Sequence, residues 1–389
     1  MSKQKPLKVV VTTRLYTPEV GAAAFRLKAL VDGLVERGAE VKVVTTTPPA
    51  GSGVFKPIYK ISRWPVLRDE GGNVRGYVQY LSFDIPAFFR LLFASADVVV
   101  SEPPPTTGVI VALSSMLRRR PFVYYAADVW TEALSAMEVP AAVKKAMGFV
   151  EGFVMRRAAK VIAVSQPVAE QVAKFNVPAE RIHVVGNGVD TTVFGPDGAK
   201  AVTQKPYFVY TGTMSEWQGA SIFIEALAKV IQTYPEAELR FFGQGTDESN
   251  LKELASKLAP GNVHFGGVVP PSEAASWIRG ASGALVSIKP GQGYDFAKPT
   301  KIYAAAGCGT PVVFAGHGDG ANVVADNGLG VAADYTVDAV ATAMETLLTE
   351  PDSDRSARTE WVLAHASLQA SGRVAAAQVV GLAGSKTSQ

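Results

Sequence analysis

Residues 7–37 of this 389-residue chain read LKVVVTTRLYTPEVGAAAFRLKALVDGLVER. The first part, residues 7–13, is a nearly continuous apolar run rich in valine, which favours a strand buried in a parallel sheet. Residues 24–37 repeat apolar side chains at the three- and four-residue spacing of an amphipathic helix. Gly21 lies in the loop between them. The stretch therefore predicts a strand, a glycine-containing turn and a helix.

The same alternation of strand and helix continues along nearly the whole sequence. The predicted strands are residues 7–13, 40–45, 97–101, 122–125, 161–164, 182–185, 207–211, 238–242, 263–265, 283–288, 311–314 and 330–332. The clearest helical stretches are residues 24–37, 141–159, 220–233, 247–258 and 272–280. Several strands are apolar on both faces, as strands covered by helices should be. We predict an α/β protein made of doubly wound parallel sheets.

Twelve predicted strands are too many for one open sheet, so we predict two Rossmann-like domains. The polar, Gly- and Pro-containing break at residues 194–205 falls near mid-chain. We place the first domain at residues 1–195 and the second at 196–360. A C-terminal helical segment, 361–389, is expected to pack back on the first domain. Ligands of such folds bind beyond the carboxyl ends of the strands, so we expect a cleft between two facing domains.

Composition excludes several classes of protein. Cys308 is the single cysteine, and the four histidines are far apart in the sequence, so we expect no metal site and no disulfide framework. No apolar run approaches the roughly 20 residues that span a bilayer, and we expect a soluble, cytoplasmic protein. Net charge is +3, with the basic excess in residues 1–195. One half of the chain should therefore meet an anionic partner, but no nucleic-acid-binding pattern is present.

The loops that follow predicted strands carry the candidate site residues. Arg14, Glu19, Gly21 and Ala22 lie between the first strand and its helix, where free amides and the helix dipole favour an anion. Asp128 ends the fourth strand, where its carboxylate could orient a substrate hydroxyl. Gly21 could equally serve only to form a tight turn, and Asp128 could equally be a solvated or helix-capping residue. The functional and the purely structural interpretation both remain open at this point.

Short motifs recur in a fixed order along residues 7–335. They are Tyr16-x-Pro-Glu, Ser101-x-Pro-Pro, Asp128-x-Trp, Asn187-Gly-Val-Asp190, Tyr210-Thr-Gly-Thr213, Gln218-Gly219, Phe242-Gly-x-Gly245, Pro299-x-Lys301 and Ala306-Gly-x-Gly-x-Pro311. This order resembles that of the family 4 glycosyltransferases, which are retaining, sugar-nucleotide-dependent enzymes of the GT-B fold. The chain is most similar to the subgroup that includes bacterial O-antigen and capsule transferases.

The resemblance implies a donor site in the second domain and an acceptor site in the first. A departing diphosphate would be stabilised by amides, helix dipoles and basic side chains, without a cofactor or metal. The implied catalytic residues are Asp128 and Lys301, of which Lys301 would hold the diphosphate. The implied donor-binding residues are Gly212, Thr213, Gln218, Gly243, Gly245, Pro299, Thr300, Lys301 and Asp319. Arg14, Glu19, Gly21 and Ala22 would form the acceptor or phosphate loop.

Three positions depart from the family pattern. Thr213 and Gln218 stand where many members carry an Arg and a Lys that hold the diphosphate. Ala304 stands where members carry a Glu that pairs with the ribose hydroxyls. Asp319 is a candidate replacement for that carboxylate. The missing Glu leaves open a catalytically weak or non-catalytic partner subunit of the same fold.

Three segments of the first half mix apolar residues with arginines. They are residues 88–93, 116–120 and 155–157. This pattern suits contact with an anionic membrane, although buried helices and solvated helix ends explain it as well. We therefore expect the protein at the inner face of the membrane, acting on a sugar or a polyprenyl-linked acceptor.

These observations favour a retaining glycosyltransferase that moves a hexose or acetamido-hexose from a nucleotide diphosphate, with UDP the preferred base. Cell-surface polysaccharide or glycoconjugate synthesis is the expected setting. A sugar-nucleotide epimerase can share the architecture and is the second alternative to the partner subunit. Fold analogy alone does not choose among the three.

Overall fold

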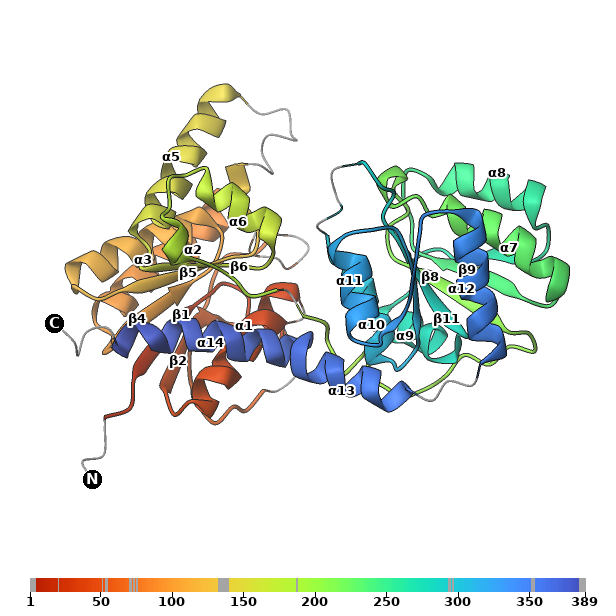
Figure 1. Ribbon diagram of the computed structural model, residues 1–389. Coiled ribbons are helices and arrows are strands. Elements are labelled where there is room, and N and C mark those ends of the chain that lie inside the picture. The colour runs from red at the N-terminus through yellow and green to blue at the C-terminus, as the bar shows by residue number, and fades with distance from the viewer. Residues whose placement is uncertain are drawn as a thin grey trace. The chain divides into compact units, whose positions relative to one another are not determined.

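The computed structural model describes residues 5–384 except residues 20, 51, 53–54, 70–71, 73, 75, 132–139, 187, 293–294, 296 and 351–353. The chain divides into two compact units (Figure 1). The N-terminal unit contains Met1–Asn187 together with Leu368–Gln389, and the C-terminal unit contains Gly188–Ser367. Each unit is an α/β domain built on a parallel sheet, which confirms the predicted fold class.

The N-terminal unit has a seven-stranded sheet in its described part, in the order β3-β2-β1-β4-β5-β6-β7. Its strands are β1 (Lys8–Thr12), β2 (Glu40–Thr46), β3 (Lys60–Trp64), β4 (Val98–Ser101), β5 (Phe122–Ala126), β6 (Lys160–Ala163) and β7 (Ile182–Val184). Its helices are α1 (Ala22–Glu36), α2 (Tyr77–Leu92), α3 (Pro105–Leu117), α5 (Ala141–Arg157), α6 (Gln166–Ala173), η1 (Ala179–Arg181) and α14 (Leu368–Gly384). All strand pairs are parallel, with Val10 opposite Lys42 on β2 and Val99 on β4.

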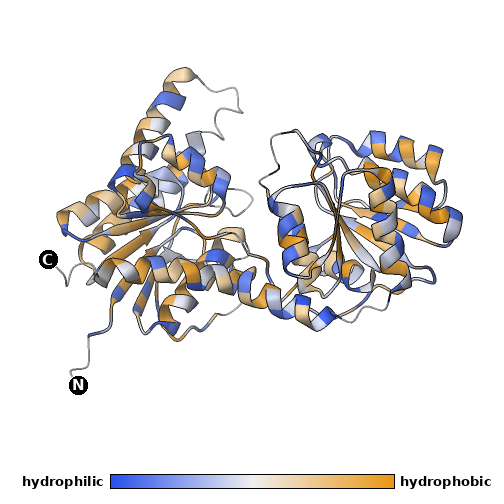
Figure 2. Ribbon diagram, viewed as in Figure 1, coloured by the Kyte–Doolittle hydropathy of each residue, from blue (hydrophilic) through white to orange (hydrophobic). Residues whose placement is uncertain are grey.

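Alternate residues of each strand enter different cores. Val9 and Val11 of β1 pack with Leu30 of α1 and Val379 of α14 on one face of the sheet. Val10 packs on the other face, in the core that α2, α3 and α5 cover. Burial on both faces explains why the strands are apolar throughout, whereas the helices alternate apolar and polar sides (Figure 2).

The described part of the C-terminal unit has a six-stranded parallel sheet in the order β10-β9-β8-β11-β12-β13. Its strands are β8 (Tyr207–Thr211), β9 (Glu238–Phe242), β10 (Val263–Phe265), β11 (Gly283–Ser287), β12 (Val312–Ala315) and β13 (Gly330–Ala333). Its helices are η2 (Glu216–Gln218), α7 (Ser221–Thr233), α8 (Glu248–Leu258), α9 (Pro271–Gly280), α10 (Thr300–Gly307), α11 (Asp319–Asp326), α12 (Val337–Thr349) and α13 (Arg355–His365).

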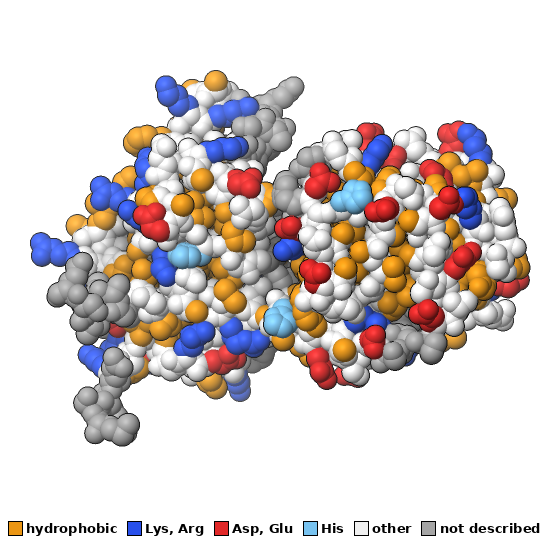
Figure 3. All heavy atoms as spheres, viewed as in Figure 1, with side chains coloured by type: hydrophobic (Ala, Val, Ile, Leu, Met, Phe, Trp, Pro, Cys, Tyr) orange, Lys and Arg blue, Asp and Glu red, His pale blue; other side chains and the backbone are white. Residues whose placement is uncertain are grey.

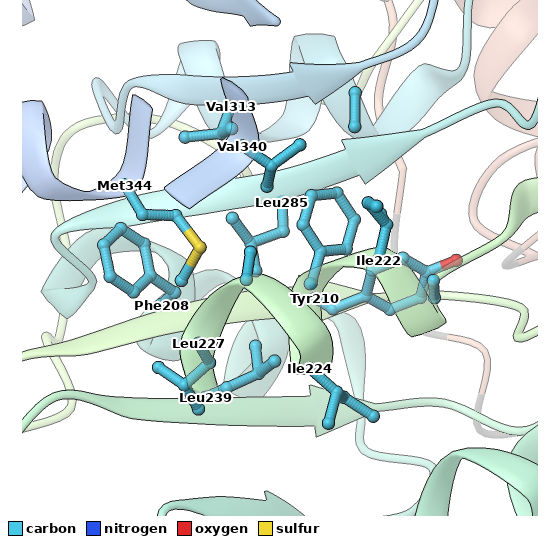
Figure 4. Close-up of a cluster of buried hydrophobic side chains, with 14 of the residues drawn as sticks. Phe208, Tyr210, Ile222, Ile224, Leu227, Leu239, Leu285, Val313, Val340 and Met344 are labelled. Carbon is cyan, nitrogen blue, oxygen red and sulfur yellow. The ribbon is translucent and has the colours of Figure 1, made fainter. Parts of the chain in front are cut away.

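One face of this second sheet packs against α7, α8 and α12. Figure 4 shows Phe208 and Tyr210 of β8 among Leu227 of α7 and Met344 of α12. A separate core on the opposite face includes Ile302 of α10 and Val362 of α13. Both sheets reverse their strand order once, between β1 and β4 and between β8 and β11. Ligand sites in such sheets lie beyond the strand ends at this reversal.

The unit boundaries differ from those predicted at residues 195 and 360. Phe194 packs against the core of the C-terminal unit, and Arg279 donates to the Val193 and Gly195 carbonyls at 3.1 Å. Val362 belongs to the same core. These contacts assign residues 188–195 and 361–367 to the C-terminal unit. Helix α14 alone returns to the N-terminal unit, where it packs against α1.

Candidate functional site

A cavity of about 580 Å³ opens at the carboxyl edge of the sheet in the C-terminal unit. Its floor comes from the segments that follow β8 and β9, and one wall from the first turn of α10. It brings together most of the predicted donor-binding residues: Gly212, Thr213, Gln218, Gly243, Pro299, Thr300 and Lys301. The loops that the sequence singled out thus line one common cavity.

Lys301 is the only charged group of this cavity whose side-chain nitrogen is buried, among the residues that the structure describes. Its Nζ has no hydrogen-bond partner there and lies 4.0 Å from the centre of the Tyr210 ring. Burial lowers the pKa of Lys301 from 10.5 to about 7. An ammonium held without a counter-ion is a position that an anionic ligand would complete.

The backbone next to Lys301 is shaped by two glycines with positive φ. A Cβ on Gly212 would lie 3.8 Å from Lys301 Nζ, and a Cβ on Gly243 would lie 1.9 Å from the Gly212 carbonyl oxygen. The two loops can approach so closely only without side chains. The Gly212 N–H donates to the Phe242 carbonyl at 2.8 Å. This amide therefore continues the sheet ladder and is already hydrogen-bonded.

Amides at the start of α10 are better placed to meet an anion. Pro299 is the N-cap residue, and no side chain caps this helix end. Thr300 and Lys301, the first two helical residues, both line the cavity. Uncapped amides at a helix N-terminus carry partial positive charge, which adds to that of the Lys301 ammonium.

Two predicted donor-binding residues lie outside the lining of the cavity. Gly245 packs against backbone, since a Cβ there would lie 2.1 Å from the Met214 carbonyl oxygen. Asp319 is half exposed at the start of α11, and its carboxylate lies 3.7 Å from Lys298 Nζ. Asp319 therefore lies beside the cavity, next to the lining residue Lys298, and not in the lining itself.

Thr213 and Gln218 are held by a small hydrogen-bond network. The Tyr210 hydroxyl donates to Gln218 Oε1 at 2.7 Å, and the Thr213 hydroxyl lies 3.5 Å from the same oxygen. Gln218 is buried. These residues thus fix the loop after β8, where the family usually places basic side chains.

Ala304 lines the cavity one turn after Lys301 and is 7% exposed. The described lining residues include no carboxylate. The remaining wall is mostly apolar and suits a flat ring; it contains Val189, Phe194, Trp217, Phe242, Val268, Val269, Pro271 and Ala274. The cavity therefore offers one apolar end and one cationic end.

A second cavity, of about 430 Å³, lies at the carboxyl edge of the sheet in the N-terminal unit. Its lining residues are Arg14, Leu15, Glu19, Ala23, Arg26, Arg68, Val74, Tyr80, Glu102, Pro103, Ala127, Asp128 and Trp130. They come from the segments after β1, β4 and β5 and from the first turn of α2. The predicted residues Arg14, Glu19 and Asp128 are brought together here.

Arg14 is the least compensated charge of this second cavity. Its guanidinium carbon lies 3.8 Å from the centre of the Tyr80 ring, and its Nη1 is buried without a hydrogen-bond partner among the described residues. Burial lowers the pKa of Arg14. Asp84 is also buried, and burial raises its pKa while the Thr107 hydroxyl donates to it at 2.6 Å.

Two buried ion pairs hold the rest of the cavity wall in place. Arg26 Nη2 lies 3.2 Å from Glu102 Oε2, and Arg68 Nη1 lies 2.8 Å from Glu19 Oε2. Burial raises the pKa of Glu102, and the Arg26 charge opposes this effect. Pairing of this kind fixes the two arginines and leaves little net charge for a ligand.

Asp128 lies at the rim of the second cavity, on the loop after β5. Desolvation raises the pKa of Asp128. The loop is fixed by the buried Glu151, whose carboxylate accepts from the Trp130 and Thr131 amides at 2.8 and 2.9 Å. Asp128 is thus presented on a rigid turn.

Gly21 and Ala22 are not among the lining residues. Gly21 is the N-cap of α1 in an extended conformation, and Ala22 is the first helical residue. Sequence reasoning missed Arg68, which lies between β3 and α2, and Tyr80, which lies in the first turn of α2. Only the three-dimensional path of that connection brings them to the site.

The described residues contain no group of three or more His, Cys, Asp or Glu side chains that could hold a metal ion. The Asp352-Ser-Asp354 triplet of the sequence lies partly outside the described residues.

Comparison with known families agrees with the two-unit division. Residues 21–188 match the model of a glycosyl transferase 4-like domain, and residues 205–350 match that of glycosyl transferases group 1. Among curated proteins, a D-inositol 3-phosphate glycosyltransferase from Segniliparus rotundus is 27% identical over 231 residues. The match covers 55% of this chain and 50% of that protein, so the chain spans about half the length of this relative.

Solved structures share the architecture at low sequence identity. Anabaena HepE in complex with UDP has a TM-score of 0.59 and 17% identity, covering 97% of this chain and all of that chain. WaaG, a glycosyltransferase of lipopolysaccharide biosynthesis, has a TM-score of 0.55 and 17% identity, covering 96% of this chain and all of that one. At this identity the likeness concerns the fold. With both domain models matched in order, the chain belongs to the family 4 glycosyltransferases of the GT-B fold.

Proposed function

We propose that this glycosyltransferase moves a hexose or acetamido-hexose from a UDP-sugar to an acceptor hydroxyl with retention of configuration. The observation that carries this proposal is the buried, unpartnered ammonium of Lys301 in the first turn of α10. A buried cation without a counter-ion is unfavourable unless a ligand supplies the negative charge. The diphosphate of a nucleotide sugar has that charge.

The donor would lie across the cavity of the C-terminal unit from its apolar to its cationic end. The base would contact the apolar wall near Phe242 and Val269. The diphosphate would meet Lys301 and the amides of Thr300 and Lys301. Anabaena HepE was solved with UDP and with UDP-glucose, which supports the choice of UDP as the nucleotide.

The chemistry would follow a front-side displacement. The bond from the anomeric carbon to the phosphate oxygen breaks, and the acceptor oxygen bonds to the same face of that carbon. The acceptor proton passes to the departing phosphate oxygen, so no protein base is consumed. The protein positions the reactants and stabilises the developing phosphate charge, which is the task assigned to Lys301.

The acceptor would occupy the cavity of the N-terminal unit. Asp128 would accept a hydrogen bond from an acceptor hydroxyl, and Arg14 would donate to an acceptor oxygen through its free Nη1. The paired charges of Arg26 and Arg68 favour a polyol or sugar over a highly charged acceptor.

We further propose that the acceptor is held at an anionic membrane. Leu81, Ile85, Phe89 and Phe93 follow one another at four-residue spacing along α2 and its C-cap, and each is at least half exposed. An apolar helix stripe open to solvent is typical of an interfacial helix. The described helices include none long and apolar enough to cross a bilayer.

The three mixed segments of the sequence contribute unequally to this surface. Phe89 and Phe93 are exposed, and so is Leu117. Arg120 is buried and donates to the Leu91 and Ala94 carbonyls, and Met155 is buried as well. Arg120 and Met155 therefore do not belong to this surface, because they pack inside the unit.

Titration with UDP, GDP and ADP, followed by thermal unfolding, tests donor binding. We expect UDP at about 100 times its Kd to stabilise the protein by about 2.7 kcal/mol. Lys301→Ala should abolish this effect, whereas Lys257→Ala, an exposed lysine on α8, should not. Stabilisation by none of the nucleotides would refute the proposal.

A second assay tests transfer. It measures the release of UDP from UDP-sugars with and without acceptors taken from a lipid extract. Release that depends on acceptor supports a transferase. UDP binding without any release would indicate a non-catalytic subunit, and acceptor-free conversion of one UDP-sugar into another would indicate an epimerase.

A vesicle experiment tests the membrane surface. Phe89→Ser combined with Phe93→Ser should reduce sedimentation of the protein with anionic vesicles several-fold, and unchanged sedimentation would refute that role.

A further inference from the structure

A third cavity, of about 920 Å³, lies in the N-terminal unit at the edge where the strands begin. It is lined by the segments before β1 and β4 and by the C-terminal ends of α1, α3 and α14. The acceptor cavity lies at the opposite edge of the same sheet, so the length of the strands separates the two. The start of β1 and the end of α14 meet at this end of the unit (Figure 1).

Positive charge dominates this cavity. Its charged lining residues are Lys5, Arg37, Arg118, Arg119, Arg120 and a single acid, Asp97. Asp97 Oδ2 accepts from the Lys8 amide at 2.8 Å, which ties it to the start of β1. In the part of the chain that the structure describes, no carboxylate forms an ion pair with any of the five cations. Figure 3 shows Lys and Arg side chains projecting from this end of the unit.

Arg120 forms the inner wall of the cavity and is only 9% exposed. Its Nη1 and Nη2 donate to the Ala94 and Leu91 carbonyls at 3.0 and 2.7 Å, but its Nε is buried without a partner among the described residues. Burial lowers the pKa of Arg120, and the nearby Arg118 charge lowers it further. Arg120 is thus held by carbonyls at the C-terminal end of α2, with the like charge of Arg118 nearby.

Arg119 adopts a left-handed backbone with φ of 49°. It follows the C-cap of α3, and the Arg120 amide donates to the Ser115 carbonyl at 3.0 Å, as in a helix end that normally selects glycine. The neighbouring helix α1 ends in the same way, with Gly38 at φ of 77°. An arginine in this conformation costs on the order of 1 kcal/mol, which indicates that its side chain has a role.

Helix dipoles explain only part of this arrangement. The C-terminus of a helix carries partial negative charge and favours one nearby cation. Arg37 meets that need at α1, and Arg118 meets it at α3. Arg120 serves the C-terminal end of α2, because it donates to the Leu91 and Ala94 carbonyls there. The strained Arg119 exceeds this need.

We propose that this cavity, the arginine pocket (Lys5, Arg37, Arg118, Arg119 and Arg120), binds a phosphate-bearing ligand with at least two negative charges. Guanidinium groups match phosphate oxygens in paired hydrogen bonds, and several of them suit a multiply charged group. The source is a phospholipid headgroup or a soluble phosphate. The site goes beyond the transfer reaction proposed above and does not depend on it.

Two titrations of the full chain distinguish the two sources. Inorganic pyrophosphate is titrated calorimetrically into protein carrying Lys301→Met, because the donor cavity would otherwise bind it too. In parallel, the protein is sedimented with phosphatidylcholine vesicles with and without cardiolipin, whose headgroup carries two phosphates. Both measurements are repeated with Arg118→Gln and Arg119→Gly combined, and with Lys144→Gln and Lys145→Gln combined.

We expect the Arg118→Gln, Arg119→Gly protein to bind its ligand about 10- to 30-fold more weakly, whether that ligand is pyrophosphate or the cardiolipin vesicle. The Lys144→Gln, Lys145→Gln control removes the same charge from α5 and should change binding less than about threefold. Pyrophosphate binding identifies a soluble ligand, and binding to cardiolipin vesicles alone identifies a headgroup.

Glycine suits the left-handed position, so the Arg119→Gly change should not lower the melting temperature, which separates lost binding from lost folding. Absence of binding in both arms would overturn the proposal. Equal weakening by the α5 control would overturn it as well, because the effect would then be one of diffuse surface charge.

Discussion

Replacing Lys301 by methionine should stabilise the protein when no ligand is bound. Methionine keeps the length and helix propensity of the side chain but removes its charge. Burial lowers the pKa of Lys301 from 10.5 to about 7. A difference of this size corresponds to about 5 kcal/mol of unfavourable free energy at and below pH 7.

The pH dependence follows from which state holds the proton. Between pH 7 and 10.5 the unfolded chain keeps a proton on Lys301 that the folded protein releases. The unfolded state therefore binds more protons, and the stability of the wild-type protein rises with pH in this window, by up to about 1.4 kcal/mol per pH unit. Below pH 7 both states are protonated, and the cost of burial is complete.

Relaxation around the side chain and water entry reduce the expected gain at pH 7. We expect at least about 2 kcal/mol for Lys301→Met, or roughly 4–8 °C in the melting temperature of the C-terminal unit. The gap between variant and wild type should narrow from pH 7 to pH 9. Differential scanning calorimetry at several pH values measures both effects, with Lys257→Met on α8 as the control that should change neither.

UDP should reverse the order of stability. The wild-type protein gains stability from saturating UDP, whereas Lys301→Met should gain little, because the diphosphate finds no ammonium. A gap that stays constant from pH 6 to 9, or a methionine variant less stable than the wild type, would show that Lys301 is not a desolvated cation. The argument for a diphosphate site would then fail.

Three further changes test other parts of the structure. Ala304→Glu should strengthen UDP binding about tenfold relative to pyrophosphate, since only UDP offers ribose hydroxyls to the new carboxylate; calorimetry of both ligands measures the ratio, and an unchanged ratio contradicts the expectation. Arg14→Gln should leave the thermal shift with UDP unchanged but lower acceptor-dependent UDP release at least tenfold; a lost thermal shift would contradict its assignment to the acceptor. Gly243→Ala should destabilise the protein by more than about 3 kcal/mol in thermal unfolding, because the new Cβ would lie 1.9 Å from the Gly212 carbonyl oxygen. Gly261→Ala is the control: this glycine also has a positive φ, but its Cβ would meet no atom within 4 Å, so the loss of stability should be smaller.

The sequence predicted the sheets well because their strands are buried on both faces. Predicted strands 207–211 and 238–242 coincide with β8 and β9. The edge strand β3, Lys60–Trp64, was missed because it is half-buried and carries polar residues. Helix α2, Tyr77–Leu92, was also missed, since it carries apolar residues on both its buried and its exposed side and Pro86 lies inside it. Apolar patterning finds elements that pack on both sides and fails at exposed edges.

The candidate site was predictable at the level of loops and less so at the level of atoms. Strand ends identified the loops that carry Lys301 and Asp128. The sequence could not show that the Gly212 amide is already bonded to Phe242, because hydrogen-bond partners depend on the register of neighbouring strands. It also could not show that Asp319 lies outside the cavity lining and pairs with the lining residue Lys298.

Position 304 and Lys301 are coupled through the geometry of α10. They lie three residues apart in one helix, so a carboxylate at position 304 would be within reach of the Lys301 ammonium. With Ala304 the ammonium has no acid of its own in the described cavity lining, and its pKa falls to about 7. The cost of desolvating Lys301 is therefore offset only when an anion enters. If the cavity binds a nucleotide sugar as proposed, we expect the missing carboxylate to weaken recognition of ribose and to increase the share of binding energy that depends on the diphosphate.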